Sequence, residues 1–352
     1  MGTATSIGFD NIQILSPYPV QSLTELTIIK QPNAHATLCY KGIIPEEMAD
    51  SYIEKAKVGD TIEVIQTGNG KTLKTLFAGQ VASIGVKTVM GVYYLEVEGI
   101  SGTFNLDIKR KSRSFQNTKM KYRDLVQKVL EEYPEANFKD RVFKDALLEQ
   151  LIIQHSITDW VLIKQLASQF GAVIIPDCTQ AKPNFWIGLP DGAEGTLTDF
   201  QYTVVRDLSK YSDTTTNYSD LPLEDFVFYE VESYQYLNLG DQVKFRDKKL
   251  RVAKSTAVLH DSILKFTYLI APEAGIRQNQ ILNEWLTGTA FEGKIIDRAK
   301  DKIKVHLEID QEQPVEEACW IPYATLYTAE GNSGWYCMPE IGDSVKVYIQ
   351  DA

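Results

Sequence analysis

The chain has 352 residues, of which 44% are hydrophobic and 24% are charged, and its formal net charge at pH 7 is -11. This composition can build buried cores, and the length predicts two or three domains, or as many as four small ones. Because binding to a phosphate backbone or to anionic lipid needs clustered Lys and Arg, the acidic balance argues against both.

The beginning of the chain and its cysteines indicate a protein made in a reducing cytoplasm. The opening MGTATSIGFDNIQ lacks the basic and apolar regions of a secretory signal, and no apolar run reaches the length of a membrane span. The cysteines are far apart and form no C-x-x-C pair, so we favour reduced thiols over a disulfide or a metal site. They are Cys39, Cys178, Cys319 and Cys337.

Strands are predicted from Leu23 to about Asn105. The segments TLCYKGII and TIEVIQT are rich in β-branched residues, and Asn69-Gly70 between two such runs is typical of a type I′ hairpin. A phosphate-binding loop would need Gly where Ile65 stands, so TGNGKT is interpreted as a hairpin. We expect an antiparallel barrel or sandwich here.

Two helices and two strands are predicted next. TKMKYRDLVQKVLEEYP has a helical apolar stripe, with Thr118 as its cap and Pro134 as its stop. TDWVLIKQLASQFG has a second stripe, with Thr158 as the cap and Gly171 at the end. The strands AVIIPD and NFWIGLP complete a small α/β unit.

Strands are predicted again from about Asp199. Turn residues separate apolar runs up to Ile270, and Pro272 opens the segment APEAGIRQNQILNEWL, which we interpret as a connecting helix. In GKIIDRAKDKIKVHLEID, apolar residues from Ile303 to Ile309 alternate strictly with polar ones. A period of two predicts a strand with one solvated face.

One phrase occurs three times: KVGDTIEVIQ from Lys57, NLGDQVKFRD from Asn238 and EIGDSVKVYIQ from Glu340. Gly can adopt the positive φ of a tight turn, and Asp can accept hydrogen bonds from its neighbouring backbone. A single Gly-Asp is a common entry to a strand. Three copies with similar flanking hairpins predict repeated β modules.

Catalytic and metal-binding patterns are missing from the sequence. His35, His155, His260 and His306 stand apart without ligand partners at helical or strand spacing. There is no G-x-S-x-G motif, and no pair of carboxylates stands out. We therefore predict a non-enzymatic assembly of β modules without a cofactor or a metal.

Aromatic residues gather in ACWIPYATLYTAEGNSGWYCMPEIGD, beside Gly and Pro. Such a stretch can line a ligand groove, form a core or form a subunit interface. No Lys or Arg lies between Cys319 and Asp343, whereas a barrel that stacks single-stranded nucleic acid needs basic residues. We favour a core or an interface. The candidate residues are Trp320, Trp335, Tyr336 and Pro339.

The same stretch, WIPYATLYTAEGNSGWYCMPEIGDSVKVYIQ, resembles the OB-fold neck module of VgrG-type spike proteins and of contractile-phage spikes. GKIIDRAKDKIKVHLEID is similar to the first strands of that module. The two predicted helices resemble the helical pieces of the hub portion. The resemblance extends over nearly the whole chain from about Leu23, and its most specific part is the aromatic-Gly-Pro-Glu-x-Gly-Asp stretch.

The resemblance implies a mainly β, multidomain fold with two tail-tube-like antiparallel β-barrels, a small α/β domain between them and a C-terminal OB-fold. The implied boundaries are a first barrel over 1–110, an α/β domain over 111–192 and a second barrel over 193–271. A helical linker over 272–288 and an OB-fold neck over 289–352 follow.

The resemblance also implies a function. Members of this family are trimeric hubs of phage tails, tailocins or related contractile injection systems, and they join a hexameric tail tube to a threefold spike. The implied partners are further copies of the chain, the tube protein, a spike tip and baseplate or wedge proteins, in a virion or a released particle. Members usually continue beyond the neck, whereas this sequence stops at Ala352. We therefore expect the tip to be a separate protein, a lost segment or absent, and we expect no cell-wall hydrolysis.

An alternative interpretation is a carbohydrate-binding or glycan-hydrolysing protein of a cell surface, with Trp335 as a sugar platform. The two interpretations differ in their tests. A hub forms a stable trimer and binds tube protein, whereas a sugar enzyme turns over a glycan and loses that activity when one or two carboxylates are replaced.

We predict that Trp335→Ala lowers the stability of the trimer, because this aromatic residue is assigned to the neck core or its trimer contact. Thermal unfolding and native mass measure the effect. An unchanged transition temperature together with an unchanged native mass would contradict the assignment.

Overall fold

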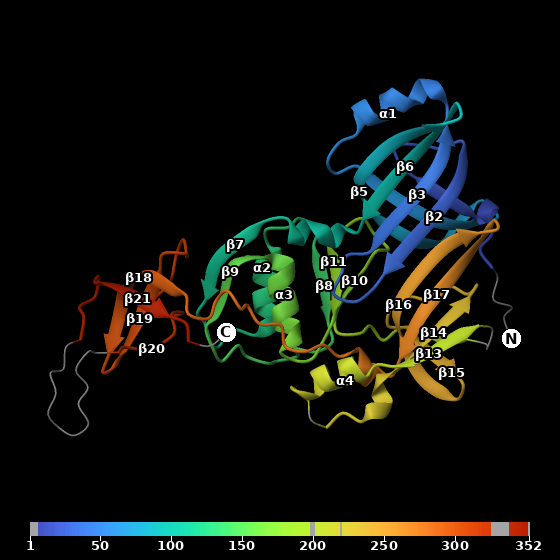
Figure 1. Cartoon of the computed structure of the whole chain (residues 1–352). Coiled ribbons are helices and arrows are strands. Elements are labelled where there is room, and N and C mark those ends of the chain that lie inside the picture. Colours follow the sequence, from blue (N-terminus) through green and yellow to red (C-terminus); the bar gives the residue numbers. More distant parts are fainter. Residues whose placement is uncertain (1–5, 198–200, 219, 325–337, 351–352) are drawn as a thin grey trace. The chain divides into compact units, whose positions relative to one another are not determined.

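A computed structural model of the chain describes residues 6–197, 201–218, 220–324 and 338–350 (Figure 1). The fold is mainly β, as the sequence predicts. The chain divides into two compact units. The first comprises Met1–Leu106, Tyr133–Val142 and Ala167–Gln280, and the second comprises Asp107–Glu132, Phe143–Leu166 and Ile281–Ala352.

The first unit contains two groups of strands, which we call the first and second β modules. The first module consists of β1 (Ile12–Leu15), β2 (Ser22–Lys30), β3 (Thr37–Ile44), β4 (Thr61–Gly68), β5 (Lys71–Val89) and β6 (Val92–Ile100). The second module consists of β12 (Glu194–Thr196), β13 (Tyr202–Arg206), β14 (Val227–Ser233), β15 (Gln242–Phe245), β16 (Lys248–His260) and β17 (Ile263–Ala271).

The two modules have the same strand layout. The strands of the first module are paired in the order β2, β3, β6, β5, β4 and β1, and those of the second in the order β13, β14, β17, β16, β15 and β12. One pairing differs in direction, since β1 is antiparallel to β4 whereas β12 is parallel to β15. The modules are joined because β2 also pairs with β16, which makes one twelve-stranded sheet.

The modules differ in their connections. Helix α1 (Ala49–Lys55) lies between β3 and β4, where the second module has a loop without a helix. Helix α4 (Leu208–Thr215) lies between β13 and β14, where the first module has a short turn. Asp207 caps α4, because its Oδ1 accepts a hydrogen bond from the Lys210 N–H at 2.8 Å. The additions are therefore in the loops, and the strand framework is preserved.

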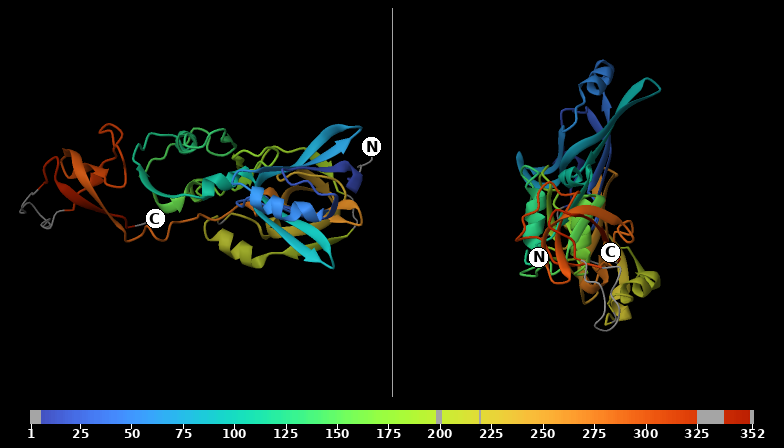
Figure 2. Two further views of the ribbon diagram at one scale, coloured as in Figure 1. Left: turned by 90° about the horizontal axis from the view of Figure 1, so that it is seen from above. Right: turned by 90° about the vertical axis from the view of Figure 1, so that its left-hand side faces the viewer.

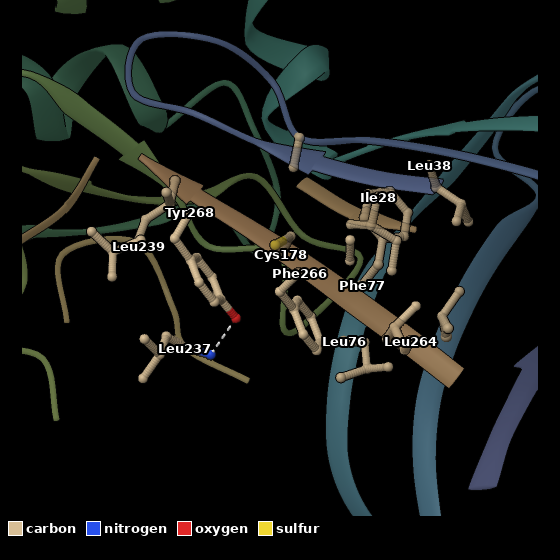
Figure 3. Close-up of a cluster of buried hydrophobic side chains, with 14 of the residues drawn as sticks. Ile28, Leu38, Leu76, Phe77, Cys178, Leu237, Leu239, Leu264, Phe266 and Tyr268 are labelled. Carbon is tan, nitrogen blue, oxygen red and sulfur yellow. Dashed lines mark hydrogen bonds between the residues drawn. The ribbon is translucent and has the colours of Figure 1, made fainter. Parts of the chain in front are cut away.

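Both modules contribute to one hydrophobic core. Ile28 and Leu38 from the first module and Leu264 and Phe266 from the second are at most 2% exposed and belong to one cluster of buried side chains (Figure 3). Tyr268 completes it, and its hydroxyl accepts a hydrogen bond from the Leu237 N–H at 2.8 Å. Burying these side chains stabilises the fold by roughly 1.5–3 kcal/mol each.

The three Gly-Asp phrases form the same turn. Gly59, Gly240 and Gly342 have φ of 91°, 80° and 98°, values that favour glycine. The carboxylate of the following Asp accepts a hydrogen bond from the N–H three residues earlier in the chain. The distances are 2.9 Å for Asp60 and Lys57, 2.7 Å for Asp241 and Asn238, and 2.8 Å for Asp343 and Glu340. The predicted role of both residues is confirmed.

Each turn also docks on a bulge of the neighbouring strand. The carbonyl oxygens of Asp60, Asp241 and Asp343 accept hydrogen bonds from partner-strand N–H groups at 2.8–3.0 Å. The donors are Val81, Val252 and Ile295. A register shift follows each donor directly, between 81 and 83, between 252 and 254 and between 295 and 297. The repeated phrase therefore marks a turn that fits a bulge.

The predicted hairpin and helices are formed, with one corrected boundary. Asn69 and Gly70 have φ of 50° and 72°, as a type I′ turn requires. Helix α3 (Asp159–Ser168) is capped by Thr158, whose Oγ1 accepts from the Val161 N–H. Helix α2 (Tyr122–Leu130) begins four residues after Thr118, so the predicted Thr118 cap is wrong. The carbonyl of Thr118 instead accepts a hydrogen bond from the Glu149 N–H.

Short strands occur in both units. In the first unit, β11 (Asn184–Ile187) lies between β10 (Ile174–Pro176) and β8 (Asn137–Asp140). In the second unit, β7 (Arg110–Phe115) pairs with β9 (Ile152–Thr158). The 3-10 turns are η1 (Phe9–Asn11), η2 (Glu46–Met48), η3 (Gly102–Asp107), η4 (Leu223–Phe226) and η5 (Glu273–Ile276).

The helical linker predicted over 272–288 is not formed, although the structure describes this whole segment. Only the 3-10 turn η5 follows Pro272. Tertiary hydrogen bonds then hold the chain in an extended form, because the Gln278 N–H donates to the Gly171 carbonyl and the Gln278 side chain bonds to Asn33 and Ala172. Such bonds satisfy the backbone without a helix.

A four-stranded sheet lies in the second unit. Its strands are β18 (Ala290–Ala299), β19 (Lys302–Leu307), β20 (Ile321–Pro322) and β21 (Ser344–Tyr348), in the order β20, β19, β18, β21. Ile303, Val305 and Leu307 are buried, as their alternation predicts. Lys304 lies on the face predicted to be solvated but is only 9% exposed, since its Nζ donates to the Val315 carbonyl and lies over the Trp320 ring.

Asp241→Ala is expected to lower the free energy of unfolding by about 1–3 kcal/mol, because two backbone N–H groups lose their acceptor. Asp241 is 6% exposed and accepts from Asn238 and Ala193 at 2.7 and 2.9 Å. Urea unfolding measures the change, with the exposed Asp213→Ala as the control. A loss no larger than the control's would contradict the role of this turn.

The stability contributed by Asp60 is expected to fall in acid. The hydrogen bonds from the Tyr18 hydroxyl and from the Lys57 N–H hold the pKa of Asp60 below its ordinary value. A lowered folded-state pKa stabilises the protein above the unfolded pKa of about 3.9, and this stability is lost as the pH falls through the folded pKa. The gap in urea midpoint between the wild type and Asp60→Asn should therefore narrow below about pH 4. A gap that stays constant down to pH 2 would be the contrary result.

Candidate interaction surface

The second module ends in an exposed strand edge. All five residues of β13 are exposed, and Val204 and Val205 are 52% and 54% exposed. β14 pairs with one edge of β13, and within the described part of the chain no strand pairs with the other edge. Exposed apolar strand edges are sites at which another strand can add to a sheet.

The first module has a second open edge, on the distal part of β5. β4 pairs with β5 only as far as Gln80, whereas β6 pairs with β5 up to Val89. From Ser83 to Val89 the other edge of β5 has no partner strand among the described residues. This distal hairpin extends away from the rest of the first module (Figure 2).

The local patterns of the sequence predicted neither open edge, although the sequence contains a signal for that of β13. β2 contains Leu-Thr-Ile-Ile-Lys over residues 26–30, and β13 reads Tyr-Thr-Val-Val-Arg over 202–206. The two pentapeptides share an identical Thr, two β-branched residues and a terminal cation. An apolar strand that is covered in one module therefore has an exposed counterpart in the other.

Two of the four site residues predicted from the sequence, Trp320 and Pro339, lie in the described part of the second unit. Trp320 is 42% exposed, with Lys304 Nζ 5.0 Å from its ring centroid, so its indole lies at the surface of the four-stranded sheet. Pro339 is half-buried, and its carbonyl accepts from Arg298 at 2.9 Å. Trp335 and Tyr336 lie outside the described residues. Their assignment to a core or a trimer contact stays a prediction.

Two cavities in the described parts are lined by both polar and apolar residues. In the first unit, a cavity of about 360 Å³ has buried Lys30 in its wall, and Lys30 Nζ lies 3.2 Å from the Tyr236 hydroxyl. In the second unit, one of about 670 Å³ is lined by His155 and the 84% exposed Trp285. Among the residues that the structure describes, no three His, Cys, Asp or Glu side chains gather to hold a metal ion. None of the described helices is long and apolar enough to cross a membrane.

Solved structures share this fold. One is the c3393 protein of E. coli, a component of the type VI secretion system with structural similarity to the T4 bacteriophage tail proteins gp27 and gp5. It superimposes on this chain with a TM-score of 0.67 at 14% sequence identity, and the match covers 97% of this chain and 96% of that protein. A 43 kDa tail protein of prophage MuSo2 from Shewanella oneidensis gives a TM-score of 0.57 at 12% identity, covering 77% of this chain and 99% of that one.

A third similar structure is a chain of the Francisella PdpA-VgrG complex, with a TM-score of 0.57 at 8% identity, covering 96% of this chain and 75% of that chain. No family model and no curated protein matches the sequence. The fold is thus that of VgrG-type and phage-tail proteins, and the resemblance seen in the sequence is confirmed at that level. The three proteins named above are a component of a type VI secretion system, a prophage tail protein and a chain of a VgrG complex.

Proposed function

We propose that this protein is the structural baseplate hub of a contractile injection system, a phage tail, a tailocin or a related secretion system. Three copies form a ring that joins a hexameric tail tube to a threefold spike. The duplicated β module carries the proposal. Two modules with one strand layout in each of three chains present six similar surfaces, which match a sixfold tube while the chain itself keeps threefold symmetry.

The structural neighbours support this role. They come from secretion-system and phage-tail assemblies, and one of them, the E. coli c3393 protein, covers nearly the whole chain. The proposed partners are therefore other copies of this chain, the tube protein, a spike tip protein and baseplate or wedge proteins. The protein assembles in the bacterial cytoplasm and then becomes part of a virion or a released particle.

A hub acts through complementary surfaces and catalyses no reaction. Its two modules are built from hydrophobic packing and repeated Gly-Asp turns, and the same turn recurs in the second unit. The barrel form of the modules and the OB form of the four-stranded sheet belong to this proposal. In such a hub, the sheet of β18 to β21 is the neck toward the spike, with Trp320 available at its surface.

The proposal predicts a native mass of three times the 39.7 kDa chain mass, measured by light scattering over a range of concentrations. Electron microscopy with tail tube protein should show rings stacked coaxially on the tube end. The glycan alternative is tested in parallel by incubating the protein with bacterial cell-wall polysaccharide. A monomer that neither associates nor caps tubes, or a protein that cleaves the polysaccharide, would overturn the hub.

A further inference from the structure

We infer that neighbouring copies join by strand pairing: the free edge of β13 in one copy adds, antiparallel and in a defined register, to the distal part of β5 in the next. The contact repeats between chains the pairing that β2 and β16 make within one chain. This inference deepens the proposed hub, and its three-copy form rests on that proposal.

Equivalent positions in the two modules follow from their turns and bulges. Thr61 and Gln242 come directly after the Gly-Asp turns and pair with Gln80 and Arg251. One residue later, β5 and β16 each contain the bulge on which the turn docks. Residue 80 of the first module therefore corresponds to residue 251 of the second, and the shared bulge keeps this offset in the strand that follows.

The hairpins beyond the bulges also correspond residue by residue. Residues 83–89 of β5 and 254–260 of β16 have the same length and pair directly with β6 and β17. Each hairpin closes with two residues of positive φ, Met90-Gly91 at 50° and 78°, and Asp261-Ser262 at 48° and 63°. The distal part of β5 is thus the counterpart of the distal part of β16.

The distal part of β16 is covered by β2. Its residues 255–258 pair antiparallel with residues 30–27 of β2. In this covered edge Ala257 lies opposite Ile28, and the two are 4% and 2% exposed. The structure therefore contains one complete example of the contact, made by the second module's hairpin and the first module's edge strand.

β13 and the distal part of β5 are the counterparts of β2 and the distal part of β16, but neither of their outer edges has a partner strand among the described residues. β2 and β13 occupy equivalent places, because Leu26 lies opposite Tyr40 on β3 and Tyr202 lies opposite Val231 on β14. Val204 is then the counterpart of Ile28, but it is 52% exposed instead of 2%. Carrying the register of β2 and β16 over to the open edges gives four pairs between copies. They are Ile84 with Arg206, Gly85 with Val205, Val86 with Val204, and Lys87 with Thr203.

The side chains at these positions fit an antiparallel sheet. Val86 and Val204 would lie directly opposite each other, and pairs of β-branched residues on one face stabilise such sheets. Thr203, Val204 and Val205 preserve the character of Thr27, Ile28 and Ile29 in the covered strand. An intramolecular pairing of β13 with β5 of its own chain is not present, since each edge is free in the described structure. The partner that fits both edges is a second copy of this chain.

Repeating the contact orders the modules alternately around an assembly. Within a chain the first module meets the second through β2 and β16, and between chains the second meets the next first module through β13 and β5. The contact is head-to-tail. Repeating it therefore forms a closed ring only if the rotation from one copy to the next divides a full turn evenly. In a three-chain ring every sheet edge of this kind is paired, which removes the exposed strand edges.

Disulfide trapping tests the register. We would combine Val86→Cys with Val204→Cys in a background that carries Cys39→Ser, Cys319→Ser and Cys337→Ser and retains the buried Cys178. Directly opposed positions have Cβ atoms about 4.5–5.5 Å apart, close enough for a disulfide after small adjustments. Mild oxidation should convert most of the protein into covalent species of up to three chains on a non-reducing gel.

Two matched variants control the experiment. Val86→Cys with Thr203→Cys shifts the pair by one residue and places the thiols on opposite faces of the sheet, so it should stay uncrosslinked. Ile28→Cys with Ala257→Cys reproduces the intrachain contact and should lose both thiols without a change in chain mass. Circular dichroism of every reduced variant checks that it is folded.

The outcomes separate this inference from the hub proposal. Covalent trimers with the directly opposed pair, and none with the shifted pair, support both. No cross-link in a protein whose native mass is that of a trimer overturns the strand pairing and leaves the hub with a different contact. No cross-link together with a monomeric mass at every concentration overturns both. Covalent species that grow beyond three chains support the strand pairing and overturn the closed trimer.

Discussion

The requirement that strand edges be paired governs this molecule. Each β module has an edge strand at one end and a long hairpin whose distal part lacks a partner within the module. Inside one chain, β2 supplies that partner to β16, so two modules become one twelve-stranded sheet with a common core. Unpaired backbone groups and exposed valines remain where the same geometry recurs without a neighbour. The proposed ring rests on this constraint of the strand edges and not on any individual side chain.

The Gly-Asp turns make the duplication possible at atomic level. A glycine with positive φ lets the chain reverse, the Asp carboxylate binds the backbone before the turn, and the Asp carbonyl binds the bulge residue of the next strand. Each turn thus fixes both the start of one strand and the register of its neighbour. The same device occurs in both modules, and the hairpins beyond it, residues 83–89 and 254–260, have equal lengths, as the proposed contact between copies requires.

Apart from the direction of β12, the modules differ mainly in the loops that surround this framework. Helix α1 is inserted between β3 and β4 of the first module, and α4 is inserted between β13 and β14 of the second. The observed contact within a chain and the proposed contact between chains can therefore have the same sheet geometry but different surrounding loops. In a hub, such loops are free to meet different neighbours around the ring, while the strand framework keeps the spacing regular.

The sequence alone determined the elements whose signals are local. Alternation and turn chemistry predicted the β modules, Asn69-Gly70 marked its hairpin, and the apolar stripes marked α2 and α3, because backbone angles and side-chain periods depend on near neighbours. Tertiary structure decided the rest. Gln278 bonds to distant backbone instead of continuing a helix, Thr118 serves a neighbouring turn instead of capping α2, and Lys304 is covered by Val315 and Trp320. The likeness of residues 26–30 to 202–206 relates β13 to β2, but only the tertiary structure shows that β2 is covered by β16, more than two hundred positions away, whereas β13 has no partner on its other edge among the described residues.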